Sequence, residues 1–148
     1  MKQANTNATD WKIWVRYAYN DLGIAVREME RECNPRHRAY EAILMHCQQS
    51  AEKMLKAYAL KNITGINPKV FSHDLEAIRI ECAKVDNGFH SVRFTKHIAY
   101  LGAFVTARYP DFMFSINSSH ALRGLNSAKR VYSFIAVRLG LNSAFIIE

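Results

Sequence analysis

Residues 47–58 read CQQSAEKMLKAY and lie inside a long segment that has one apolar face. Small and apolar side chains recur in this segment at Ile43, Cys47, Ser50, Met54, Ala57 and Leu60. Steps of three or four residues are the repeat of one face of an α-helix. Gln49, Lys53 and Lys56 fall on a neighbouring face. The stretch therefore predicts a helix with a buried face and a polar edge.

Prolines mark the limits of this helix and separate it from its neighbours. Pro35 suits a first helical turn, and Pro68 interrupts the pattern, so we expect a helix over residues 36–62. An apolar stripe of the same period predicts an earlier helix over residues 10–32. Thr9 is its expected N-cap, since threonine hydroxyls accept hydrogen bonds from a first helical turn.

Two shorter helices are predicted in the middle of the chain. Ser72 is a suitable N-cap for the first of them, and the turn signal Asn87-Gly88 closes it. The second must stop near Arg108, because Pro110 disfavours helical geometry at the residue before it.

The last predicted helix begins after the capping residues Asn117, Ser118 and Ser119. No segment alternates with the two-residue period of a β-strand. We therefore expect an all-α fold: an up-and-down four-helix bundle with an additional short helix. At this length one domain is expected over residues 1–148, with its core at about 10–140.

The net charge of +7 is concentrated in the second half of the chain. Residues 1–86 carry thirteen Lys or Arg against eleven Asp or Glu, whereas residues 87–147 carry seven basic residues against Asp111 alone. Such a distribution attracts polyanions such as nucleotides, RNA or an acidic protein, although it also serves solubility.

Composition also bears on compartment and cofactors. No apolar stretch is long enough to span a bilayer, and we expect no membrane association and a cytoplasmic location. The three cysteines have no Cys-x-x-Cys spacing, and no histidines form a paired ligand motif. We therefore expect neither a metal nor another cofactor.

Lys53 is the first candidate for contact with a phosphate. Lys56 has Glu52 four residues before it, a favourable helical pair, whereas the position four residues after Lys53 is Ala57. An ammonium without a partner beside a buried face could bind a phosphate, and a solvated surface lysine is the other interpretation.

The second candidate is the tetrapeptide RYPD at residues 108–111. Pro110 fixes a turn at a helix end, Arg108 offers a planar fork and Tyr109 a flat ring, a combination that suits a nucleotide. In the alternative interpretation Arg108 interacts with the helix dipole and Asp111 hydrogen-bonds the turn.

A third motif, Ser72-His73-Asp74, does not predict a catalytic triad. Adjacent residues point in different directions, and a triad is defined by spatial geometry. Helix capping accounts for Ser72 and Asp74 without chemistry.

The three motifs in this order resemble the HEPN family, named for nucleotide binding in higher eukaryotes and prokaryotes. They are residues 47–58, the His-Asp-Leu opening at residues 73–75, and RYPD, which resembles the signature of one large subgroup. The resemblance covers about residues 10–140. It implies a helical, dimeric domain that binds an ATP-like or GTP-like nucleotide or RNA. Its candidate nucleotide-binding residues are Lys53, His73, Arg108, Tyr109 and Asp111, and His73 also has a structural role.

The resemblance further implies a protein partner. HEPN proteins are often paired with a minimal nucleotidyltransferase in a toxin-antitoxin or phage-defence module. Many are metal-independent ribonucleases with four to six residues between an arginine and a histidine near the last long helix. Here only Arg31 and His37 have that spacing, at the junction of the first two helices. Arg93 and His97 have one residue too few between them and are interpreted as neighbours on one helix. We therefore expect nucleotide binding without catalytic residues; a ribonuclease with an atypical site and a helical protein-interaction module remain alternatives.

Overall fold

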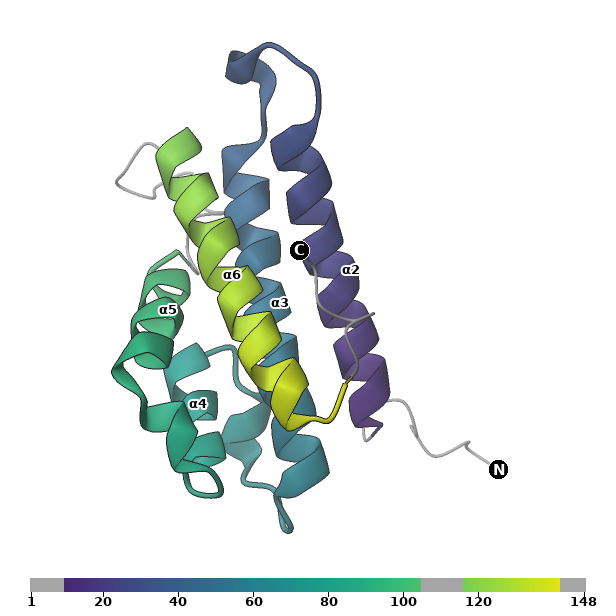
Figure 1. Cartoon of the computed structure of the whole chain (residues 1–148), viewed down its shortest axis with the longest axis vertical. Coiled ribbons are helices and arrows are strands. Elements are labelled where there is room, and N and C mark those ends of the chain that lie inside the picture. Colours follow the sequence, from purple (N-terminus) through teal and green to yellow (C-terminus); the bar gives the residue numbers. More distant parts are fainter. Residues whose placement is uncertain (1–9, 105–115, 142–148) are drawn as a thin grey trace.

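The computed structural model describes residues 10–104 and 116–141, and these residues form helices without a β-strand. Figure 1 shows the arrangement. The α-helices are α2 (Trp11–Glu30), α3 (Tyr40–Asn62), α4 (Leu75–Ala83), α5 (Val92–Gly102) and α6 (Ser118–Arg138). Short 3-10 helices cover Pro35–His37, Pro68–Phe71 and Asn87–His90.

The central element is α3, which packs against all the other α-helices of the described chain. In Figure 1 the chain runs upward in α2, downward in α3, upward in α5 and downward in α6, while the short α4 lies beside the lower end of α3. This arrangement confirms the predicted all-α up-and-down bundle with an additional short helix.

Because α3 has neighbours on several sides, its buried surface is wider than one stripe. Gln48, Glu52 and Lys56 are buried together with the apolar residues of the helix. On the side facing α6, Gly124 allows close approach, since a Cβ atom there would overlap the Leu44 side chain. The position of α3 therefore carries polar side chains into the interior.

Several helix limits differ from those predicted. The N-cap of α2 is Asp10, whose side chain accepts from the Lys12 N–H at 3.0 Å. Thr9 lies outside the described residues. The second helix begins at Tyr40 rather than at residue 36, because Pro35 opens a separate 3-10 turn. For α2, Thr9 and Asp10 are adjacent residues that could each cap the helix, and the local sequence does not decide at which of them the helix begins.

The later helices show the same pattern. Asp74, not Ser72, caps α4 and accepts from the Glu76 N–H at 3.0 Å; the Ser72 hydroxyl accepts from the Asp74 N–H instead. The helix α5 ends at Gly102, short of the predicted stop near Arg108. Asn117 caps α6 as predicted, in a capping box with His120.

Phe104 and Phe134 do not lie on an open apolar patch. Phe104 is buried in a small cluster with Leu44 and Ile116. Phe134 is half-buried and stacks on Phe94 with ring centroids 4.2 Å apart. Within the described residues, no helix is long and apolar enough to cross a membrane.

Candidate functional site

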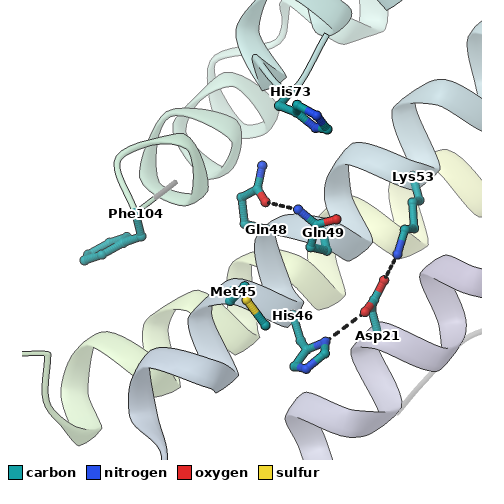
Figure 2. Close-up of a pocket in the computed structure, with 8 residues that line it drawn as sticks. All are labelled: Asp21, Met45, His46, Gln48, Gln49, Lys53, His73 and Phe104. Atoms are coloured by element: carbon teal, nitrogen blue, oxygen red, sulfur yellow. Dashed lines mark hydrogen bonds and ion pairs between the residues drawn. The ribbon is translucent and has the colours of Figure 1, made fainter. Parts of the chain in front are cut away.

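A polar cavity of about 380 Å³ lies over α3, between α2 and the end of α5 (Figure 2). We call it the α2–α3 cavity. Its lining combines charged, amide and apolar side chains: Asp21, Met45, His46, Gln48, Gln49, Lys53, His73 and Phe104.

Asp21 organises one side of the cavity. It lies on the buried face of α2 beside Leu22, so its carboxylate points at α3. One oxygen lies 2.8 Å from His46 Nδ1, and the other accepts from Lys53 Nζ. His46 and Lys53 are two helical turns apart on one face of α3, which lets one carboxylate bridge them.

Glu52 organises a second group with the same composition. Its Oε1 atom accepts from Lys56 Nζ at 3.3 Å and lies 2.7 Å from His73 Nδ1. The carboxylate and Lys56 are both buried, whereas the His73 side chain is 77% exposed. His73 therefore links a buried ion pair to the rim of the cavity.

Gln48 is the unusual member of the lining. The residue is only 2% exposed, and its Oε1 atom accepts from Gln49 Nε2 at 2.9 Å. Its own Nε2 atom has no hydrogen-bond partner among the described residues. Figure 2 shows this nitrogen directed away from Gln49, into the space between His73 and Phe104.

The structure brings two of the predicted binding residues, Lys53 and His73, to one cavity. The expectation that Lys53 lacks a partner is wrong, because it pairs with Asp21 on another helix. The predicted pair of Glu52 and Lys56 is confirmed. Arg108, Tyr109 and Asp111 lie outside the described residues, which end at Phe104 and begin again at Ile116.

A second hollow region lies along α5 and α6, where two adjoining cavities of about 490 and 320 Å³ share Arg93 and His97. We call it the basic groove. Its polar and charged lining residues are Ser91, Arg93, Lys96, His97, Tyr100, Arg123, Asn126, Ser127, Arg130 and Ser133. No Asp or Glu belongs to this described lining.

The groove keeps its positive charge uncompensated. Within the described chain, Arg93, Lys96, Arg123 and Arg130 form no ion pair, in contrast to Lys53, Lys56 and Arg79. Arg123 instead lies over the Tyr100 ring, 4.2 Å from its centroid.

The positive charge of the groove affects the pKa of His97. Burial lowers the pKa of its imidazole, and the charges of Arg130, Arg93, Lys96 and Arg123 lower the pKa further. Its Nδ1 atom lies 2.9 Å from the hydroxyl of the buried Ser127. The imidazole is therefore held in place and favours its neutral form.

The Arg31 and His37 pair does not form a catalytic arrangement. The Arg31 guanidinium pairs with Glu28 at 2.9 Å and donates to the backbone carbonyl of His37 at 3.2 Å. It closes the connection between α2 and α3 and does not contact the imidazole. Across the described residues, no three His, Cys, Asp or Glu side chains gather in a way that could hold a metal ion.

Sequence reasoning missed Asp21, His46 and Gln48 as members of the cavity. Asp21 carries a usable signal, since a carboxylate on the apolar stripe of a helix requires a buried partner. Arg93 and His97 were treated only as neighbours on one helix, whereas the structure places both in a groove with cations from α6.

The family model of the HEPN domain matches residues 11–139. The chain belongs to the HEPN domain family. Searches of the curated proteins and of the solved structures gave no match. The HEPN match runs from α2 to the end of α6, so the α2–α3 cavity and the basic groove both lie within it. Membership in the subgroup defined by the RYPD motif stays a prediction.

Proposed function

We propose that this HEPN domain binds the phosphate groups of a nucleotide or RNA in the basic groove. The observation that carries the proposal is the set of four cations, Arg93, Lys96, Arg123 and Arg130, around one groove without a described acidic partner. A bound phosphate would supply the missing negative charge through charge-assisted hydrogen bonds.

The geometry favours more than one phosphate. Arg123 and Arg130 are seven residues apart on α6, a rise of roughly 10 Å along the helix axis. Arg93 and Lys96 of α5 line the same hollows. A chain of phosphates fits this row of charges better than a single anion, and binding by such a row weakens as salt releases the counterions.

The proposal is tested by calorimetric titration of the full chain with ATP, GTP and a short single-stranded RNA at two salt concentrations. Arg93→Ala and Arg130→Ala should each weaken RNA binding, while Arg16→Ala, an exposed cation of α2 outside the groove, serves as the matched control. Equal losses from all three variants would mean diffuse attraction without a site.

The predicted residues outside the groove form a separate part of the proposal. Lys53, His73, Arg108, Tyr109 and Asp111 are proposed to contribute to nucleotide binding, as the family resemblance implies. Arg108→Ala should then lose more affinity than Arg138→Ala. Arg138 is the appropriate control because it is already paired with Asp86 at 3.0 Å.

Cleavage of RNA in the groove is a second candidate function, favoured by His97. A neutral imidazole among cations can accept a proton from a ribose hydroxyl. Cleavage also needs an acid for the leaving group, and the described lining offers no second histidine and no carboxylic acid. We therefore expect binding without cleavage. Metal-free RNA cleavage that disappears in His97→Ala would establish the second function.

The proposed assembly is a homodimer that works with a minimal nucleotidyltransferase in a toxin-antitoxin or defence-type module. Family membership supports this proposal. Light scattering coupled to size exclusion tests the dimer, and a mass near 17.0 kDa across a tenfold dilution would refute it. If neither ATP, GTP nor RNA binds at low salt, an acidic protein becomes the better candidate for the groove.

A further inference from the structure

We infer that the α2–α3 cavity is a binding site for a nucleobase, read by the side-chain amides of Gln48 and Gln49. The inference adds a second, uncharged recognition site to the proposed nucleotide binding. Its starting point is the buried Gln48 amide in the cavity lining, whose nitrogen has no described partner and is directed away from Gln49.

A buried amide nitrogen without a partner costs stability, because it has lost its hydrogen bonds to water. The Gln48 side chain lies on the central helix α3, where Leu44 and Cys47 are buried apolar neighbours in the sequence. An apolar residue of similar size would avoid this cost. A ligand that accepts a hydrogen bond from Gln48 accounts for the amide at this position.

The charges of the cavity favour a neutral ligand over a phosphate. Its one ammonium group, Lys53, is already compensated by Asp21. The nearest other lysine, Lys56, is buried with Glu52. A phosphate here would have to compete with two carboxylates, whereas the basic groove offers cations without competitors.

The remaining lining suits a planar heterocycle. Gln48 presents a donor, and the neighbouring Gln49 presents a carbonyl oxygen that accepts no hydrogen bond among the described residues. A glutamine donor and acceptor match the edge of a base. Met45 and Phe104 add apolar walls, and a volume of about 380 Å³ is within the range of small-molecule sites.

The assignment does not depend on how the Gln48 amide is turned. With both amides rotated by 180°, the Gln48 nitrogen would donate to the Gln49 oxygen, and the Gln48 oxygen would take the place of the free nitrogen. In either orientation one polar atom of a buried amide is left for a ligand, and the orientation decides which base edge is preferred.

The test uses nucleosides, which carry no phosphate. Adenosine, guanosine, cytidine and uridine are titrated into the ¹⁵N-labelled full chain, and the side-chain amide signals are followed by NMR. At least one nucleoside should shift the Gln48 amide signal in a saturable way. This binding should be unchanged at high salt and in Arg93→Ala, so it can fail or succeed independently of the groove.

Gln48→Leu should weaken the binding of that nucleoside by at least about tenfold, the usual effect of losing a buried hydrogen bond. The same variant should unfold at the same temperature as the wild type or higher, since it removes an unsatisfied group. Asn20→Leu, which makes the same kind of change on the exposed face of α2, is the matched control and should leave binding unchanged.

Three results would overturn the inference. They are the absence of any shift with all four nucleosides, undiminished binding by Gln48→Leu, and equal losses from Gln48→Leu and Asn20→Leu. If Gln48→Leu fails to fold, the Gln48 amide signal of the wild type decides alone. A signal that stays in place at saturating nucleoside refutes the site.

Discussion

The α2–α3 cavity and the basic groove are both lined by charged side chains, but their charges are arranged in opposite ways. In the cavity, Asp21 and the adjoining Glu52 each hold one lysine and one histidine. In the groove, four cations gather without a described acid. A buried charge needs a partner within the fold, whereas water solvates a surface charge until a ligand binds it.

The comparison separates residues that stabilise the bundle from residues that are free to bind. The cavity charges lie at the contact of α2, α3 and the segment before α4, so their pairing is part of the packing. The groove cations form no described ion pair, and the sign of their charge enters the packing only where Arg123 lies over the Tyr100 ring. Substitutions of the cavity charges should therefore lower the free energy of unfolding, whereas substitutions of the groove charges should lower RNA affinity.

The largest effect is expected from Glu52→Gln. It keeps the shape of the side chain but leaves the buried Lys56 ammonium without a counter-charge. The free energy of unfolding, measured by urea denaturation, should fall by about 3 kcal/mol. The double variant Glu52→Gln/Lys56→Met should recover part of this loss, because no unpaired charge remains. A single variant as stable as the wild type would remove the distinction between the two regions.

Asp21→Asn should have a smaller effect of the same kind, about 2 kcal/mol, because Lys53 is 23% exposed and water can partly solvate its charge. The measurement is again urea denaturation. Glu30→Gln is the control, since Glu30 is an exposed carboxylate at the end of α2 without a described ion pair, and its replacement should cost less than about 0.5 kcal/mol. If the two variants lose equal stability, the Asp21 bridge is not a structural contact.

Arg130→Ala should show the opposite signature. Its unfolding free energy should stay within about 0.5 kcal/mol of the wild type, because the side chain has no described ion pair. RNA affinity at low salt should fall by about tenfold, and the slope of affinity against salt should decrease by about one counterion. Loss of stability with unchanged RNA binding would reverse the roles of the two regions.

The smallest effect concerns pH. Because the folded pKa of His97 is lowered, the unfolded chain takes up a proton before the folded chain does. The contribution of His97 to stability is therefore complete above the ordinary histidine pKa and is lost as the pH falls through the lowered value. Between pH 7 and pH 5 the wild type should lose more stability than His97→Gln, by less than about 1 kcal/mol.

RNA binding should reverse this shift. Phosphates in the groove offset the charges of Arg93 and Arg130, so the His97 pKa, followed by the NMR signal of the imidazole, should rise when RNA is added. An unchanged pKa at saturating RNA would place the RNA elsewhere.

The number and type of the helices could be predicted from the sequence because helical periodicity is local. The stripe from Ile43 to Leu60 and the N-cap at Asn117 depend on residues at most four positions apart. The predicted N-caps of α2 and α4 were wrong. Asp10 and Asp74 act as N-caps next to residues that could serve equally well, and the choice depends on how each helix docks.

The candidate site was predictable only in part. Lys53 and His73 were identified, and both line the α2–α3 cavity. Asp21 was not, since it lies 32 residues before Lys53 and no helical spacing connects them. The sequence showed the excess of cations in the second half of the chain. It did not predict that some of them line one groove between α5 and α6.

The amino-acid sequence by itself determined the helical class, the excess of positive charge in the second half and the pair of Glu52 and Lys56. These properties depend on composition or on contacts within one helix. Only the tertiary structure decided that Lys53 is neutralised by Asp21, that Gln48 is buried with an unused donor, and that α5 and α6 bring Arg93 and Arg130 to one groove. Each of these results from packing side chains of distant segments against one another, and local sequence patterns carry no record of which segments meet.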